Sequence, residues 1–204
     1  MLVDSHCHLD FPDFEDDLDA VLDRAAAAGV GAMLTICTHL SRFERVLTVA
    51  QAHDNVFCTV GVHPHEAANE GDITPERLIE LSGHPKVVGF GETGLDYHYL
   101  HSPREAQKAS FRAHIQAARE SGLPLVVHSR EADADMAEIL TSEHQKAPFS
   151  GLLHCFGSGA ALAEAALGIG FYISFSGIVT FKNAESVREV AKTVPLQRIL
   201  VETD

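Results

Sequence analysis

The sequence is poor in basic residues. Lysine and arginine together number 15 against 29 aspartate and glutamate residues, so the 204-residue chain has a formal net charge of −14. Proteins that bind nucleic acid through electrostatics alone usually present a basic patch, and no basic cluster is visible in this sequence. If the protein handles phosphates, bound metal ions must therefore supply the positive charge at the site.

Long apolar runs and paired cysteines are also lacking. The N-terminus has no basic segment followed by an apolar one, and no stretch approaches the roughly 20 apolar residues that span a bilayer. We therefore expect a cytoplasmic protein with no membrane partner. No C-x-x-C occurs, which argues against a disulfide framework and a zinc knuckle. We expect the four cysteines to be buried and to pack like small apolar residues: Cys7, Cys37, Cys58 and Cys155. A cysteine that adjoins a metal ligand in a strand should face away from that ligand.

No linker or low-complexity stretch divides the chain, and 46% of its residues are hydrophobic. We therefore predict a single domain over residues 1–204. Short runs rich in Val, Ile and Leu predict strands at 2–6, 32–37, 56–62, 87–92, 123–128, 151–154, 172–175 and 199–202. Amphipathic stretches between them predict helices at 16–28, 42–53, 75–83, 103–121, 132–144, 159–168 and 183–193.

This regular alternation indicates a parallel sheet with helices outside it. Eight repeats favour the (β/α)8 TIM barrel of the α/β class over an open doubly wound sheet, and no G-x-G-x-x-G turn follows the first strand. The chain stops directly after the eighth strand. We therefore expect a C-terminally truncated barrel that lacks its last outer helix.

The helix over residues 103–121 carries the clearest boundary signals. Ser102 is predicted as its N-cap, Pro103 occupies the first helical position, and Glu105 can complete a capping box. Gly122 can end the helix in the left-handed conformation.

Metal-binding residue types recur where the predicted strands end. The catalytic groups of barrel enzymes occupy these strand ends, and histidine is the commonest metal ligand among side chains. The first strand ends in His6 and His8, which two-residue spacing places on one face. The other such residues are His63, His65, Glu92, His128, His154 and Asp204. The remaining histidines fall in loops or helices and are predicted to be solvated: His39, His53, His84, His98, His101, His114 and His144.

Six short motifs follow one another in order along the chain. They are His6-x-His8, Gly61-x-His63-Pro64-His65, Gly91-Glu92-x-Gly94-Leu95-Asp96-Tyr97, Pro124-Leu125-x-x-His128-x-Arg130, His154-Cys155-Phe156-Gly157-Ser158 and Glu202-Thr203-Asp204. Together they resemble the TatD-type metal-dependent deoxyribonuclease family of the amidohydrolase superfamily. The resemblance covers essentially the whole chain.

The resemblance implies two divalent metal ions bound to side chains at the strand ends. The first ion would be held by His6, His8 and Asp204, the second by His128 and His154, and Glu92 would bridge them. Mixed imidazole and carboxylate ligands suit Zn²⁺ or Mn²⁺, and Mg²⁺ is also compatible, so the identity of the metal stays open.

A pair of such ions supports hydrolysis. Asp204 is the predicted general base, because a carboxylate beside the attacking water can take its proton. The predicted catalytic residues are Asp204, Glu92 and His63. His63 and His65 are predicted to bind a phosphate or to protonate the leaving group, unless Pro64 only shapes a rigid loop.

Three further positions are left with alternatives. Arg130 is a candidate phosphate clamp or a surface ion pair with a nearby acid. Asp96 and Tyr97 are both expected to orient histidine ligands rather than to bind metal themselves. Asp4 is expected either to support an imidazole or to make a plain structural hydrogen bond.

The resemblance implies DNA as the substrate, cleaved from an end, and the acidic charge favours single strands or short pieces over long duplex. A monomer is favoured. The same ligands on the same barrel would also suit hydrolysis of an amide, ester or lactone, because activated water does not dictate the electrophile. The second alternative is a non-catalytic scaffold that binds metal.

Overall fold

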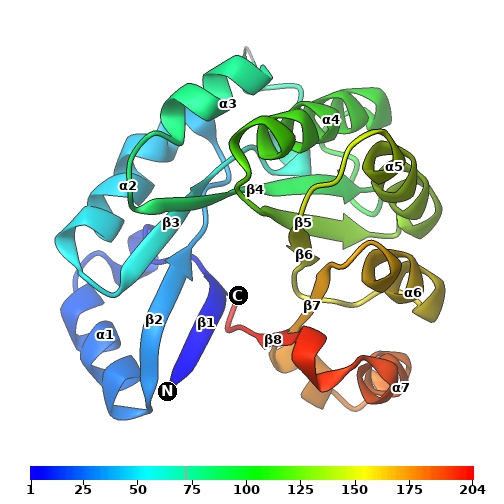
Figure 1. The fold of residues 1–204 in the computed structure, drawn as a ribbon. Coiled ribbons are helices and arrows are strands. Elements are labelled where there is room, and N and C mark those ends of the chain that lie inside the picture. The colour runs from blue at the N-terminus through cyan, green and yellow to red at the C-terminus, as the bar shows by residue number, and fades with distance from the viewer. Residues whose placement is uncertain (72) are drawn as a thin grey trace.

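The computed structural model describes residues 1–71 and 73–204. Its eight strands form one parallel sheet in sequential order from β1 to β8. The strands are β1 (Leu2–Cys7), β2 (Val30–Thr35), β3 (Val56–Val60), β4 (Val87–Asp96), β5 (Leu125–Arg130), β6 (Gly151–Leu153), β7 (Tyr172–Phe175) and β8 (Ile199–Val201). Figure 1 looks into the curled sheet, a nearly closed barrel. The predicted TIM-barrel architecture is confirmed.

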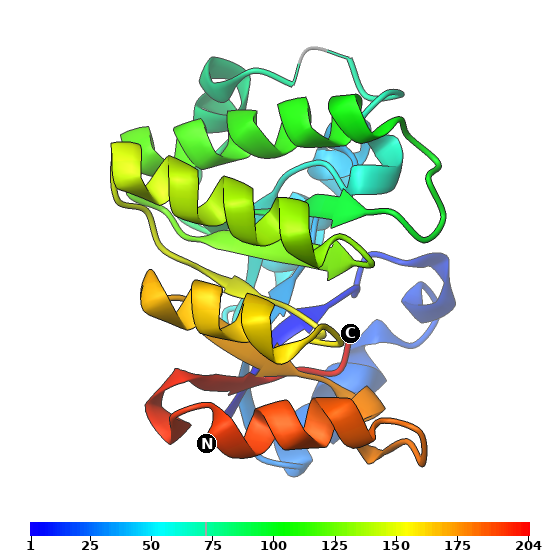
Figure 2. The same cartoon turned by 90° about the vertical axis from the view of Figure 1, so that its right-hand side faces the viewer.

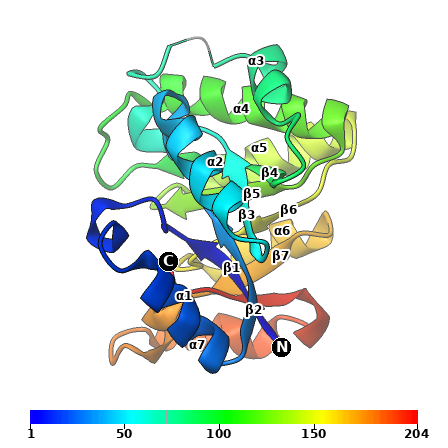
Figure 3. The same ribbon diagram turned by 90° about the vertical axis from the view of Figure 1, so that its left-hand side faces the viewer.

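Seven α-helices in the described residues surround the strands. They are α1 (Leu18–Ala27), α2 (Phe43–Ala52), α3 (Pro75–Leu81), α4 (Arg104–Ser121), α5 (Asp133–Lys146), α6 (Ala160–Gly168) and α7 (Glu185–Thr193). Figure 2 shows α4 to α7 side by side on one flank, and Figure 3 shows α1 to α3 on the other. None of the described helices has the length and apolar character needed to cross a membrane.

The boundaries of α4 differ from the prediction at one end. Gly122 closes the helix with a φ of 79°, and its N–H donates to the carbonyl of Ala118, as expected. Ser102, however, is not an N-cap. Its hydroxyl donates to the carbonyl of His65 and accepts from the N–H of Ala68, so it holds the turn after β3 instead.

Two glycines let β4 approach its neighbours around Glu92. Gly91 has a φ of 139° and Gly94 a φ of 136°, a region that glycine adopts without strain. A side chain at Gly91 would overlap the backbone of Val126, and one at Gly94 would overlap the backbone of His128. These glycines therefore bring the backbones of β4 and β5 close together beside Glu92.

The barrel closes between β1 and β8 through a few specific hydrogen bonds. The N–H of Asp204 donates to the carbonyl of His6 at 2.9 Å, and the hydroxyl of Ser5 donates to the carbonyl of Val201 at 3.1 Å. Asp4 accepts from the N–H and the hydroxyl of Thr203 at 3.0 and 2.6 Å. The C-terminus therefore lies beside β1, as Figure 1 shows.

Candidate metal centre

An open cleft of about 1010 Å³ lies at the carboxyl ends of the strands. Its walls include most of the predicted site residues: His8, His63, His65, Glu92, His128, Arg130, His154 and Asp204. His6 is fully buried beneath them and contacts Glu92. The structure thus brings together side chains from six strand ends, as the order of the motifs predicts.

Glu92 lies at the centre of this group and is only 3% exposed. Its Oε1 is 2.7 Å from Nε2 of His154 and 3.0 Å from Nδ1 of His128, whereas its Oε2 is 3.5 Å from Nε2 of His6. Burial by itself would raise the pKa of Glu92, but the charge of His154 and the nearby His63 hold the pKa well below its usual value. The carboxylate is therefore ionised and presents one oxygen to each side of the site.

Imidazole nitrogens meet in two pairs around this carboxylate. Nε2 of His6 lies 3.2 Å from Nε2 of His8, and Nδ1 of His128 lies 3.2 Å from Nε2 of His154. Two nitrogens that bind one ion tetrahedrally at about 2.0–2.1 Å are roughly 3.3 Å apart. Lone pairs this close require a shared proton or cation, so the residues present fit divalent metal ions. Groups that could hold an ion include His6, His8 and Glu92, and also His63, Glu92 and His128.

Asp204 reaches the same site from the end of the chain. Its Oδ1 is 3.5 Å from Nε2 of His6 and 3.8 Å from Nε2 of His8. Contact with His8 lowers the pKa of Asp204 below its usual value, although burial opposes this. An ionised carboxylate therefore faces the imidazoles of both His6 and His8.

Asp96 orients two of the histidines, as predicted. Its Oδ2 is 2.9 Å from Nε2 of His65 and 3.1 Å from Nε2 of His128. Its Oδ1 accepts from the N–H groups of His98 and Tyr99. Because Nε2 of His128 is engaged by Asp96, Nδ1 is left to face Glu92 and His154. Tyr97 does not share this role, since its hydroxyl donates to Asp135.

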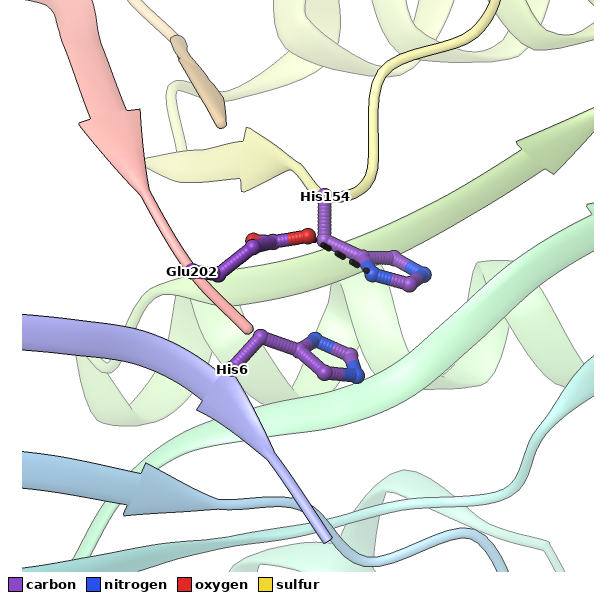
Figure 4. A group of neighbouring side chains, drawn as sticks. All are labelled: His6, His154 and Glu202. Carbon is purple, nitrogen blue, oxygen red and sulfur yellow. Dashed lines mark ion pairs between the residues drawn. The ribbon is translucent and has the colours of Figure 1, made fainter. Parts of the chain in front are cut away.

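A further carboxylate, that of Glu202, lies beside His154. Figure 4 shows the rings of His6 and His154 one above the other, with Glu202 beside the Nδ1 of His154. The ring centroids are 3.9 Å apart, and Oε1 of Glu202 is 3.5 Å from that Nδ1. Burial opposes protonation of His154, but Glu92 and Glu202 raise its pKa to about 10. Sequence reasoning did not assign Glu202 a role, although it falls within the last motif.

His63 is held in one tautomer by the backbone. Its Nδ1 accepts from the N–H of His65 at 3.1 Å, so the ring proton of neutral His63 is on Nε2, which lies 3.4 Å from Oε1 of Glu92. Burial lowers the pKa of His63 to about 3, although Glu92 acts in the opposite direction. His63 is therefore a neutral hydrogen-bond donor at neutral pH. His65 is tied to Asp96 and lines the cleft.

The structure bears on the alternative roles predicted for Arg130 and for Asp4. The guanidinium of Arg130 lies 4.8 Å from the ring centroid of Tyr99, and in the described part of the chain it forms no ion pair with Glu131 or Asp133. Because the predicted ion pair is not formed among these described residues and Arg130 lines the cleft, its role as a phosphate clamp stays a prediction. Asp4 makes the structural hydrogen bonds to Thr203 and also accepts from the N–H of His6.

Two predictions near the site are wrong. His114 is fully buried rather than solvated: it accepts from the N–H of Val62 through Nε2 and donates to the carbonyl of Ser110 through Nδ1. Cys155 lines the cleft beside Glu202 and Asp204 instead of facing away. The strand β6 ends at Leu153, so alternation of side chains no longer applies at Cys155, where φ is 39°.

Known proteins resemble this chain in both sequence and fold. A profile of the family described as TatD related DNase matches residues 3–204. The chain belongs to this family. It is 46% identical to the "uncharacterized metal-dependent hydrolase YcfH" of Escherichia coli K12, over 100% of this chain and 77% of that protein. The family resemblance predicted from the motifs is confirmed.

Two further relatives add to this comparison. The crystal structure of YJJV, a TatD homologue from Escherichia coli K12, superposes with a TM-score of 0.91 at 32% identity and covers 100% of this chain and 78% of that one. The "3'-5' ssDNA/RNA exonuclease TatD" of Enterobacter lignolyticus is 35% identical, over 100% of this chain and 78% of that protein. The TatD family relatives include metal-dependent hydrolases, and the side chains of this cleft can hold metal.

Proposed function

We propose that this TatD family member hydrolyses phosphodiester bonds of single-stranded DNA, releasing nucleotides from an end. The observation that carries the proposal is the arrangement around Glu92, whose two oxygens face different imidazole nitrogens. If two ions are bound, Glu92 is the residue that both would share. The name of the Enterobacter relative, an exonuclease of single-stranded nucleic acid, supports the choice of substrate.

The proposed ligands fall into two sets that share Glu92. His6, His8 and Asp204 form the first set, and His128 and His154 form the second. The 3.2 Å nitrogen separation within each histidine pair supports this division. When bound, two ions of Mg²⁺, Mn²⁺ or Zn²⁺ would activate water and neutralise charge on the phosphoryl oxygens. The acidic chain has few cations of its own for that task.

Three side chains have proposed roles toward the substrate. Asp204 takes a proton from the attacking water, because its carboxylate is ionised and faces His6 and His8. His63 donates its Nε2–H to a phosphoryl oxygen, in agreement with its neutral tautomer. Arg130 contacts a phosphate through its forked guanidinium. His65 is hydrogen-bonded to Asp96 and lines the cleft wall, and we assign it to substrate binding beside Arg130.

The decisive experiment uses metal-stripped protein and an end-labelled single-stranded oligonucleotide. The protein is refilled in turn with Mg²⁺, Mn²⁺ and Zn²⁺, and an Asp204→Asn variant serves as the paired control. We expect metal-dependent loss of single nucleotides, reduced at least about 100-fold in the variant, as general acid–base groups contribute 10²–10⁴-fold. A folded, metal-loaded protein that leaves the strand intact would refute the proposal and favour an amide, ester or lactone as substrate.

A further inference from the structure

A second hollow adjoins the metal centre. It has a volume of about 600 Å³ and lies between the turn after β1 and the start of α2. Its lining residues are Asp10, Phe11, Pro12, Ser41, Arg42, Glu44 and Arg45. Phe11 also lines the main cleft, so the two hollows share this residue.

The ring of Phe11 is held in place yet 40% exposed. It stacks on the imidazole of His8 with centroids 4.6 Å apart and an angle of 22° between the planes. The N–H of Phe11 donates to the carbonyl of His8, and its own carbonyl accepts from the N–H of Phe14. Pro12 follows and restricts the turn further. An aromatic ring fixed in this way beside a phosphodiester site is suited to stack on a nucleobase.

Two arginines also line the second hollow. Arg42 and Arg45 are three residues apart at the start of α2, and within residues 1–71 and 73–204 neither guanidinium is in an ion pair. Asp10 and Glu44 share the same walls, so the hollow is not suited to a free anion. A nucleotide matches this mixture better, because its base offers both donors and acceptors while its phosphate is anionic.

We infer that the second hollow binds the nucleotide next to the scissile phosphodiester. Phe11 stacks on the base of that nucleotide, and Arg42 and Arg45 contact its phosphate. The inference rests on the proposed nuclease function and adds a base-binding subsite to it. Bases within a duplex are already stacked and paired, so the subsite selects single strands.

The test combines the Phe11→Ala variant with substrates that lack one base. The substrates are a series of single-stranded oligonucleotides, each with one abasic unit at a different position near the cleaved end. With wild-type protein, we expect KM to rise about 10-fold at one position flanking the cleaved bond and kcat to stay the same. In Phe11→Ala, the intact strand should show the same rise in KM, and removing that base should have no further effect. Phe11→Tyr should retain the wild-type pattern.

The possible outcomes separate this inference from the proposed function. If the intact strand is cleaved but no abasic position depends on Phe11, the inference is wrong and the nuclease function stands. A fall in kcat for intact and abasic strands alike would assign Phe11 only to holding His8, which also overturns the inference. If wild-type, metal-loaded protein cleaves no strand, the nuclease function itself fails. Phe11→Leu, which keeps an apolar side chain at this exposed position, repeats the test if Phe11→Ala does not fold.

The arginines are tested separately. Arg42→Ala combined with Arg45→Ala should raise KM for the oligonucleotide about 10-fold and reduce its dependence on salt, because phosphate contacts release counterions. Arg77→Ala is the matched control, since Arg77 is an exposed helical arginine that lines neither hollow. Equal KM values in the double variant and this control would contradict the phosphate contact.

Discussion

Oε1 of Glu92 lies 2.7 Å from Nε2 of His154, while its Oε2 lies 3.5 Å from Nε2 of His6. Replacing Glu92 by Gln removes one charged oxygen from this position. We expect Glu92→Gln to lose most of the bound metal and at least about 100-fold in hydrolysis, measured by metal analysis and by the oligonucleotide assay. Glu143→Gln changes a buried carboxylate that pairs with Arg119 outside the cleft. That control should retain its metal, and equal metal loss in both variants would contradict a central role for Glu92.

Metal should also stabilise the fold, because an ion binds the assembled site and not the unfolded chain. At a concentration 100-fold above its Kd, an ion adds about 2.7 kcal/mol. For a domain of this size we therefore expect a rise in Tm of roughly 5–10 °C over chelator-treated protein, measured by calorimetry. Glu92→Gln should show a smaller shift. A Tm that is the same with and without metal would count against the site.

Asp96 should matter although it is not a proposed ligand. Asp96→Asn replaces an oxygen that accepts from His65 and His128 with a group that can donate instead. We expect metal affinity to fall about 10- to 100-fold, measured by competition with a chelating dye. Asp135→Asn, which affects the contacts with Tyr97 and Lys108, is the control and should bind metal normally. Normal affinity in Asp96→Asn would show that His128 is positioned without this hydrogen bond.

The contact between Asp4 and Thr203 holds the last residues of the chain in place. Thr203→Val removes the hydroxyl that donates to Asp4 at 2.6 Å and leaves the backbone hydrogen bond intact. Because Thr203 is exposed, we expect a loss of only about 1 kcal/mol in stability, but a clear loss of hydrolysis as Asp204 becomes less well positioned. Thr193→Val removes a comparable hydroxyl contact at the end of α7 and should affect stability alone. Similar activity in the two variants would contradict this role.

His114 should make stability depend on pH. Burial lowers the pKa of His114 to about 4, although its hydrogen bond to Ser110 acts in the opposite direction. In the unfolded chain the pKa is about 6.5, so between pH 6.5 and 4 the unfolded state binds more protons. The contribution of neutral His114 to stability is therefore present above pH 6.5 and lost as the pH falls, at about 1.4 kcal/mol per pH unit.

The measurement is urea unfolding of wild-type protein and of His114→Gln at several pH values. Other histidines titrate in both proteins, so the difference between the two curves isolates His114. We expect the stability advantage of wild-type protein to shrink as the pH falls from 6.5 to 4. A difference that stays constant over this range would show that His114 titrates normally.

The sequence predicts the barrel well because apolar runs and amphipathic stretches alternate without interruption. The largest error in a strand concerns β4, predicted to end at residue 92 and observed to continue to Asp96. Polar residues and two glycines interrupt its apolar pattern there, yet β4 continues to pair with β5 as far as Arg130. The pattern of apolar residues does not reveal that a strand is extended by backbone pairing with the neighbouring strand.

The site is predictable as a set of residue types but not as a geometry. Strand-end histidines can be recognised by position, whereas the division of Glu92 between two imidazole sets depends on side-chain orientation. For His114 and Ser102, the residue type and its position in the sequence led to the wrong prediction. Both look like ordinary surface or capping residues in sequence, and their actual partners lie 52 and 37 positions away. Such long-range contacts leave no local signal.

The closure between β1 and β8 has a consequence for how the protein becomes active. His8 and Asp204 come from opposite ends of the chain, and Asp4 and Thr203 join across 199 positions. Contacts so far apart in sequence require closure of a long loop, so we expect them to form after the local contacts within each βα repeat. Metal affinity would then report that the whole ring of strands has assembled, and no partly folded intermediate would present the complete set of ligands. Metal-dependent hydrolysis would therefore begin only once β1 and β8 are joined.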